Sequence, residues 1–182
     1  MPTIISSGHS ALRKGRYTEP HRPYVLTAVT HKRKPFFSDL SNARTVIHAM
    51  RFLHNEQRLA SMAFVVMPDH FHWLITPYPG HTLASLMHSL KSWTANQLSR
   101  RYATNTPVWQ TAYHDRALRQ DEDIQKVARY IIANPLRAGL VHKIGHYPPL
   151  GCHLAVGAAS YRDWPLLPPF LRGWKPLLQG PA

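Results

Sequence analysis

The order of apolar and polar positions along the chain predicts a mixture of strands and helices. The run YVLTAV at residues 24–29 has the β-branched and aromatic composition of a strand. Two further apolar runs, MAFVVM and HFHWLI, lie within residues 62–75 and are separated by Pro68 and Asp69, a pair that favours a tight turn. We therefore expect a β-hairpin here, and another extended segment over residues 108–118, VWQTAYHDRAL.

Two helices are expected, one on either side of this hairpin. The first begins near Ser41, which can cap it. Its apolar face falls near helical spacing and comprises Val46, Ile47, Met50 and either Leu53 or His54. The second spans Leu83 to about Tyr102 and has one stripe that comprises Leu83, Leu86, Met87, Leu90, Thr94 and Leu98.

The clearest helical pattern follows an acidic run at residues 121–123, which supplies a cap and negative charge at a helix start. Apolar residues then recur with the period of a helix, at Ile124, Val127, Ala128, Ile131 and Ile132. Pro135 disfavours helical geometry at Asn134, so the helix should end or kink there.

A length of 182 residues fits one domain with extensions at its ends. Residues 1–22 are polar and basic, which predicts an N-terminal arm. Residues 23–147 carry the periodic patterns and predict the folded domain. Residues 148–182 are rich in Pro, Trp, Leu and Gly, and we expect this tail to pack irregularly on the domain surface.

The charge balance indicates a polyanionic partner, because 22 Lys and Arg stand against 9 Asp and Glu, a formal net charge of +13. Nucleic acid is favoured over an anionic membrane surface, since no basic amphipathic helix with a dominant apolar face stands out. The single cysteine, Cys152, excludes an intrachain disulfide and a cysteine-based zinc site. A reducing cytoplasm fits this, and the sequence contains neither a membrane-spanning apolar run nor the apolar core of a signal peptide.

His70 and His72 lie two residues apart in the second strand of the hairpin. Successive side chains of a strand alternate between faces, so both imidazoles should point to one side, with Phe71 on the opposite, core-facing side. Such a pair can grip a metal ion. With 13 histidines in 182 residues, about one His-x-His is expected by chance, so the pair needs corroboration.

The last helix supplies the corroboration, because Tyr130 and Asn134 are four residues apart and therefore neighbours on one helical face. Taken singly, each has a structural explanation. The tyrosine can be a half-buried ring with its hydroxyl in water, and asparagine is common at helix ends. Placed over the histidine strand, the Asn134 oxygen and two imidazoles would make three ligands for Mg²⁺ or Mn²⁺, although Zn²⁺ could also bind in vitro. Tyr130 would then face a bound phosphate as a nucleophile, and Lys126 could assist it.

These segments resemble a known family. VVMPDHFHWLI resembles the HUH motif (His, bulky hydrophobic, His) of single-tyrosine transposases, and VARYIIANPLRAGLV resembles the tyrosine helix of the REP-associated tyrosine transposases. LRKGR, LTAVTHKRKPFF and VWQTAYHDRALRQDED are also similar to that branch, so the likeness runs from about residue 12 to 147. It implies an α/β (α+β), ferredoxin-like HUH-nuclease fold, with a central antiparallel sheet on which the tyrosine helix packs.

The resemblance also implies an activity and the roles of four residues. Family members are endonucleases and strand transferases that need a divalent metal, act on single-stranded DNA at the hairpin-forming repetitive extragenic palindromes (REPs) of bacterial chromosomes, and form a 5′-phosphotyrosine link. On this basis His70 and His72 are metal ligands, Tyr130 is the nucleophile and Asn134 takes the place of the third ligand. Mg²⁺ or Mn²⁺ is the expected cofactor.

Six basic residues near these elements are candidates for DNA contact: Arg13, Lys14 and Arg16 on the arm, and Lys91, Lys126 and Arg137 on the helices. Exposed Trp93 or Trp109 could stack on unpaired bases, although a core role is commoner for tryptophan. We also expect the C-terminal tail to fold against the domain and regulate access to the site.

Three other functions remain open at this point. The chain could mobilise an insertion element of its own, bind DNA hairpins without catalysis, or process RNA with a metal. The sequence does not separate a monomer from a homodimer. As a bacterial DNA-acting protein it is expected in the cytoplasm, with the nucleoid.

Overall fold

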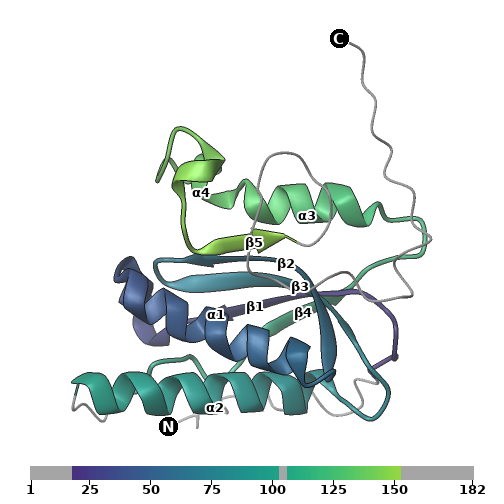
Figure 1. Cartoon of the computed structure of the whole chain (residues 1–182), viewed down its shortest axis with the longest axis horizontal. Coiled ribbons are helices and arrows are strands. Elements are labelled where there is room, and N and C mark those ends of the chain that lie inside the picture. Colours follow the sequence, from purple (N-terminus) through teal and green to yellow (C-terminus); the bar gives the residue numbers. More distant parts are fainter. Residues whose placement is uncertain (1–17, 103–105, 153–182) are drawn as a thin grey trace, which may run out of the picture.

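The computed structural model describes residues 18–102 and 106–152, which form one five-stranded sheet with helices on both faces (Figure 1). The strands are β1 (Tyr24–Val29), β2 (Leu59–Met67), β3 (His70–Pro77), β4 (His114–Ala117) and β5 (Leu150–Cys152). The helices are α1 (Leu40–Asn55), α2 (Leu83–Tyr102), α3 (Ile124–Ile132) and α4 (Asn134–Arg137). Three short 3-10 helices are η2 (His31–Arg33), η3 (Phe36–Ser38) and η4 (Ile144–His146).

The strand order is β4-β1-β3-β2-β5, and every neighbouring pair is antiparallel. The first four strands alternate with α1 and α2 in the βαββαβ succession of a ferredoxin-like fold. The expected fold class is therefore confirmed. β5 pairs with β2 and comes after residue 147, so the described sheet continues past the boundary expected there.

The two faces of the sheet carry separate hydrophobic cores. α1 and α2 cover one face, where they pack on alternate strand residues such as Leu26, Phe71 and Trp73. α3 covers part of the other face, where Ala128 and Ile131 contact a second cluster that includes Leu74 of β3. Figure 1 shows the same arrangement, with α3 on one side of the sheet and α1 and α2 on the other.

The predicted helices form, with one wrong cap. α1 is capped by Asp39, whose Oδ1 accepts a 2.8 Å hydrogen bond from the backbone N–H of Ser41. The expected cap at Ser41 is therefore wrong. Asp39 lies two residues earlier in extended geometry, which lets its carboxylate reach the first free N–H groups, and this places Ser41 inside the first turn.

α2 and α3 follow the sequence pattern closely. The buried residues of α2 are the six predicted for its stripe. At the start of α3, Asp123 Oδ1 accepts hydrogen bonds from the backbone N–H groups of Gln125 and Lys126. α3 ends at Ile132 and the short α4 begins at Asn134, so the break expected before Pro135 is confirmed. The expectation that Tyr130 and Asn134 lie on one helix is wrong, because the break at Ala133 places them on α3 and α4.

The segment at 108–118 is extended in part. Only residues 114–117 form a strand, β4, on the free side of β1, while Trp109 makes an isolated bridge with Thr30. Within the described ranges, no helix is both long and apolar enough to cross a membrane. Residues 1–17 of the predicted arm and 153–182 of the predicted tail lie outside the described residues.

Candidate metal and nucleic-acid site

His70 and His72 project from β3 on the sheet face that α3 covers, as their spacing predicts. Their ring centroids lie 4.9 Å apart with the planes at 79°. Phe71, between them, is fully buried in the core under α1 and α2. Both histidines are half-buried, so the protein fixes their rings while leaving part of each accessible.

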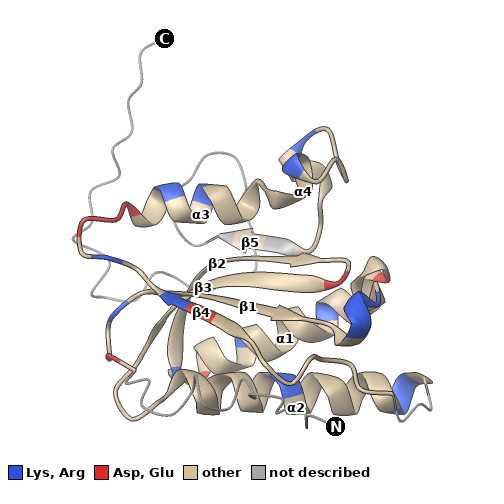
Figure 2. Ribbon diagram, turned by 180° about the vertical axis from the view of Figure 1, so that it is seen from behind, with Lys and Arg blue, Asp and Glu red and all other residues tan. Residues whose placement is uncertain are grey.

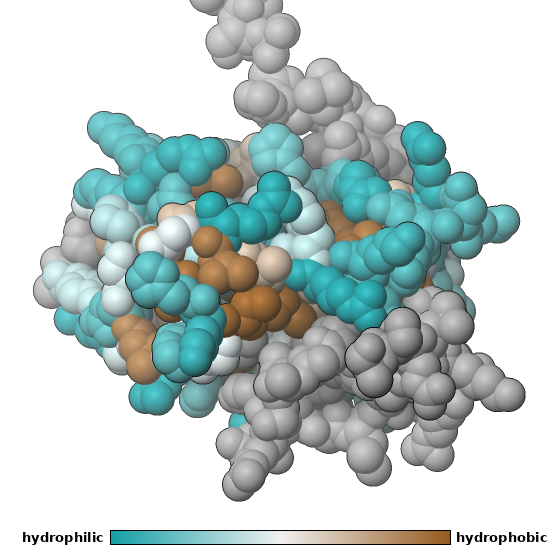
Figure 3. All heavy atoms as spheres, turned by 90° about the horizontal axis from the view of Figure 1, so that it is seen from above, coloured by the Kyte–Doolittle hydropathy of each residue, from teal (hydrophilic) through white to brown (hydrophobic). Residues whose placement is uncertain are grey.

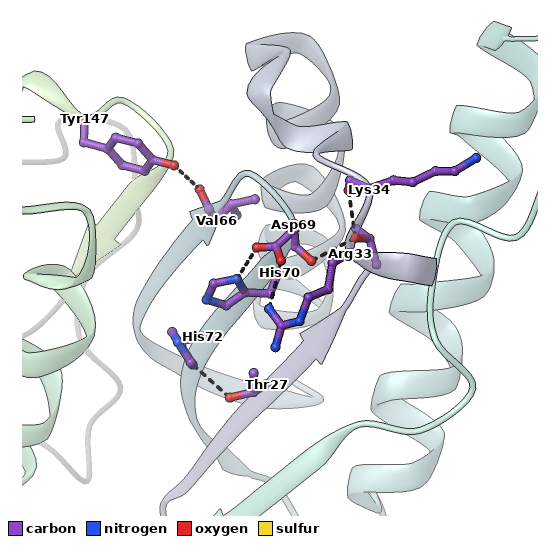
Figure 4. A network of polar contacts seen from close by, with 9 residues as sticks. Thr27, Arg33, Lys34, Val66, Asp69, His70, His72 and Tyr147 are labelled. Atoms are coloured by element: carbon purple, nitrogen blue, oxygen red, sulfur yellow. Dashed lines mark hydrogen bonds and ion pairs between the residues drawn. The ribbon is translucent and has the colours of Figure 1, made fainter. Parts of the chain in front are cut away.

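Each imidazole is held through its Nδ1 atom (Figure 4). His70 Nδ1 donates to Asp69 Oδ1 at 2.6 Å, and His72 Nδ1 shares a 2.8 Å hydrogen bond with the Thr27 hydroxyl of β1. Within the described part of the chain, neither Nε2 atom has a hydrogen-bond partner. Fixing Nδ1 in this way orients a histidine for metal binding, because it leaves the Nε2 lone pair directed at the ion.

The electrostatics favour a neutral His72 ring and an ionised Asp69 carboxylate. Burial, and then the charge of His70, lower the pKa of His72 from 6.5 to about 4, so this ring is neutral at neutral pH. Burial of Asp69 acts to raise its pKa. Hydrogen bonds from His70 and Arg33 and their charges outweigh that effect, and the pKa lies below the ordinary 3.8.

A third metal ligand from the described residues would be of another chemical type. The described residues contain no group of three or more His, Cys, Asp or Glu side chains that could hold an ion. Asn134 is half-exposed, and its Nδ2 donates to the carbonyls of Tyr130 and Ile131 at 3.0 Å each. The amide nitrogen is therefore used by the protein, and Oδ1 is the atom that remains to bind an ion. Two imidazole nitrogens and one amide oxygen fit Mg²⁺ or Mn²⁺ when phosphate oxygens complete the shell.

Tyr130 lies on α3 with 54% of its surface exposed. The Arg137 guanidinium of α4 stacks on its ring, 4.4 Å from the centroid. α3 thus carries the tyrosine on the histidine side of the sheet, but among the described residues no hydrogen bond joins Tyr130 to His70 or His72. An exposed phenol is accessible to a strand of nucleic acid.

The candidate DNA contacts are spread over the molecule. Lys126 and Arg137 are exposed on α3 and α4. Figure 2 shows that both helices carry basic positions. Lys91 lies on α2, under the opposite face of the sheet, and its Nζ donates to the carbonyls of Gln110 and Thr111 at 2.7 and 3.0 Å. Its structural contact therefore ties α2 to the segment before β4. The three arm residues Arg13, Lys14 and Arg16 lie outside the described residues.

The two tryptophans differ. Trp109 is buried in the core, and its Nε1 donates to the Thr94 hydroxyl at 2.9 Å, which confirms the structural reading. Trp93 is 45% exposed and, with Phe52, lines a pocket between α1 and α2, so the core role preferred for it is wrong. Seen from the α3 side, hydrophilic side chains surround a smaller apolar area (Figure 3).

Three residues of the candidate site were not predicted from the sequence. Asp69 was interpreted only as a turn residue, although it directly precedes the first histidine. Thr27 reaches His72 because β1 pairs in register with β3, which no local pattern reveals. Arg33, whose Nη1 donates to Asp69 Oδ2 at 2.9 Å, belongs to the basic run HKRK at 31–34, and that run was the available signal.

Comparison with known proteins identifies the family of this chain. The family model described as "Transposase IS200 like" matches residues 21–134. A Haemophilus influenzae protein named as a REP-associated tyrosine transposase is 27% identical over 153 residues, which is 78% of this chain and 86% of that protein. The solved structure of a REP-associated tyrosine transposase bound to a REP hairpin superposes with a TM-score of 0.61 at 20% identity, covering 74% of this chain and 79% of the other, and so supports the fold. The chain belongs to the family of IS200-like transposases.

Proposed function

We propose that this transposase is a REP-associated tyrosine transposase, a metal-dependent endonuclease and strand transferase that acts on single-stranded DNA next to a palindromic hairpin. The observation that carries the proposal is the histidine pair, oriented through both Nδ1 atoms on the sheet face that the tyrosine helix covers. Binding alone requires none of this. The named relatives support the REP-associated branch, because one bears that name and the other is bound to a REP hairpin.

His70, His72 and Asn134 are the residues that would hold Mg²⁺ or Mn²⁺. When bound, such an ion neutralises phosphate charge and orients the leaving oxygen. Asp69 and Thr27 keep the two imidazoles in place, which lowers the reorganisation needed on binding.

Tyr130 is the proposed nucleophile. Its phenolic oxygen attacks phosphorus, the bond from phosphorus to the 3′ oxygen breaks, and that oxygen takes up a proton while the phenol loses one. The products are a 5′-phosphotyrosine and a free 3′-hydroxyl. Because one phosphodiester replaces another, a second 3′-hydroxyl can reverse the attack without ATP. Arg137, stacked on the Tyr130 ring, limits its rotation and adds a cation beside the substrate.

The proposed partner is a DNA hairpin with an adjacent single strand, and a net charge of +13 supports binding to its phosphates. The six basic candidates given above remain proposals for these contacts. So does the organisation into an arm at 1–22, a catalytic domain at 23–147 and a tail at 148–182. A location in the bacterial cytoplasm with the nucleoid follows from the proposed substrate, and both the monomer and the homodimer are compatible with it.

The test is incubation with 5′- and 3′-labelled hairpin oligonucleotides in Mg²⁺, Mn²⁺ or EDTA, beside the variant Tyr130→Phe. We expect a metal-dependent covalent adduct on the 5′ side of the cut, absent in the variant. If both proteins bind hairpins and neither cuts them, the chain is a non-catalytic binding protein. Faster cleavage of RNA hairpins, with dependence on the 2′-hydroxyl, would instead indicate RNA processing.

The alternative that the chain mobilises its own insertion element concerns the substrate rather than the chemistry. Such an element must carry ends that the enzyme cuts on both sides of its gene. Cleavage of oligonucleotides copied from the flanking DNA, compared with scattered palindromes, separates the two cases.

A further inference from the structure

The turn that follows β1 has an unusual backbone. Residues 31–34 read His-Lys-Arg-Lys, and both Lys32 and Arg33 adopt left-handed geometry, with φ of 53° and 52°. Residues other than glycine rarely adopt this backbone conformation, and two such residues in succession are rarer still. All three cations of the turn are exposed. Strain of this kind persists only where surrounding contacts impose it, and it gathers at functional sites.

The contacts that impose it come from the histidine hairpin and from the segment before β4. The backbone N–H of Thr30 donates to the Asp69 carbonyl at 2.8 Å, and its hydroxyl donates to the carbonyls of Asp69 and Lys34 at 3.0 and 2.8 Å. The N–H of His31 donates to the Val108 carbonyl at 2.8 Å. The turn is therefore fixed relative to the turn that carries Asp69 and His70.

The result is a guanidinium held beside the histidines. Arg33 Nη1 donates to Asp69 Oδ2, while the other carboxylate oxygen accepts from His70, so Asp69 bridges the two residues. Figure 4 shows the Arg33 side chain beside Asp69 and near His70. Its side chain is 68% exposed, and within the described ranges its Nε and Nη2 have no partner.

A stabilising ion pair does not account for this arrangement. Exposed pairs contribute little to stability, and the strained backbone acts against even that. The pair between Arg116 and Glu122, also exposed, shows the difference, because there both carboxylate oxygens accept from the same arginine nitrogen at 2.8 Å. In contrast, one Asp69 oxygen accepts from the candidate ligand His70 and the other from Arg33. The Arg33 guanidinium therefore retains N–H donors that can bind a further group.

We infer that Arg33 binds a phosphate of the nucleic acid at the metal site, with its guanidinium positioned by Asp69. This inference rests on the proposed function, which supplies the substrate. The planar guanidinium can direct two parallel N–H donors at the non-bridging oxygens of one phosphate. Arg33 is then a substrate-contacting residue that lies next to the metal ligands but does not bind the ion.

The experiment measures binding of labelled hairpin oligonucleotides in EDTA, each with a single-stranded extension and one neutral methylphosphonate at successive positions. Wild type is compared with Arg33→Gln, Arg33→Lys and the charge-matched control Arg51→Gln, an exposed residue of α1 under the other sheet face. We expect Arg33→Gln to weaken binding about tenfold and to reduce the slope of log affinity against log salt by about 0.7, the value for one single-strand phosphate contact. The affinity of Arg33→Lys should lie between those of the wild type and Arg33→Gln, since lysine keeps the charge and loses the paired donors.

One methylphosphonate position should weaken binding by the wild type and leave Arg33→Gln unaffected. If the penalty is equal in both proteins at every position, the inference is overturned. Mn²⁺ affinity without DNA, followed by electron paramagnetic resonance, should change less than twofold in Arg33→Gln. A large loss there without any phosphate coupling means that Arg33 only supports Asp69.

Two further outcomes separate this inference from the proposed function. If the wild type binds no hairpin, both fail. If the wild type binds and cuts hairpins without phosphate coupling to Arg33, only the inference about Arg33 fails. Thermal melting of each variant shows that the fold persists, and Arg33→Lys carries the coupling test if Arg33→Gln does not fold.

Discussion

The two faces of β3 differ: one packs in the hydrophobic core and the other carries the candidate site. On one face Phe71 and Trp73 are fully buried against α1, α2 and their neighbours. On the other, His70 and His72 are half-buried and bonded to polar groups. Alternate residues of a single strand therefore serve as core and as candidate site. A site built on such a strand inherits the rigidity of the core behind it, and substitutions on the two faces should have different consequences.

The largest effect on stability is expected from Phe71→Ala. It removes a fully buried ring that contacts Trp109 with centroids 5.5 Å apart, and it should lower the free energy of unfolding by about 3–5 kcal/mol. Urea denaturation measures this loss. A loss below about 1 kcal/mol would show that the core face is less tightly packed than the structure indicates.

The variant His70→Ala, on the other face of β3, should have a small effect on stability and a large effect on Mn²⁺ binding. We expect a stability change within about 1 kcal/mol, because the side chain is half-buried at the sheet surface. Mn²⁺ affinity should fall by more than the roughly 10–100-fold that is typical for loss of an outer-shell partner. Paired urea denaturation and Mn²⁺ titration test both statements, and unchanged Mn²⁺ affinity would remove His70 from the ligand set.

Asp69 tests the support behind the histidines. Asp69→Ala removes the acceptor for His70 Nδ1 and should weaken Mn²⁺ binding about tenfold or more. Asp69→Asn keeps an acceptor oxygen and should restore part of the affinity. Equal affinity of the two variants in Mn²⁺ titrations would argue against orientation of His70 by this residue.

The smallest effect concerns a buried histidine of α1, the helix that packs on the sheet face opposite His70 and His72. His54 of α1 accepts a hydrogen bond from the backbone N–H of Ser61, and burial lowers its pKa below 6.5, opposed in part by a backbone hydrogen bond with Leu59. The unfolded chain therefore binds this proton at a higher pH than the folded one. Stability should fall as the pH drops below 6.5.

The variant His54→Asn keeps an acceptor near the position of Nδ1 and does not titrate. The difference in unfolding free energy between wild type and variant, from urea denaturation at pH 7.5 and pH 5, should move in favour of the variant at the lower pH. If the difference is the same at both pH values, His54 does not couple folding to protonation.

Local patterns in the sequence anticipated much of the fold. The stripe on α2, the hairpin around Pro68 and the break before Pro135 were all predictable, because each depends on residues within a few positions of one another. The cap of α1 was mistaken even though it is local, since Asp39 and Ser41 are both good capping residues and only the backbone geometry distinguishes them. Exposure of Trp93 was missed because it depends on how α1 and α2 pack.

For the candidate site, the sequence by itself determined that His70 and His72 share a face of a strand. It also put Tyr130 and Asn134 four residues apart, although they lie on α3 and α4, and the Asn134 side chain reaches back to the Tyr130 carbonyl. Only the tertiary structure decided what surrounds them. Thr27 and His72 are 45 residues apart along the chain, and Arg33 and Asp69 are 36 apart. Strand register and turn packing bring these pairs together, and both depend on burial of a core shared by distant segments, which no local pattern encodes.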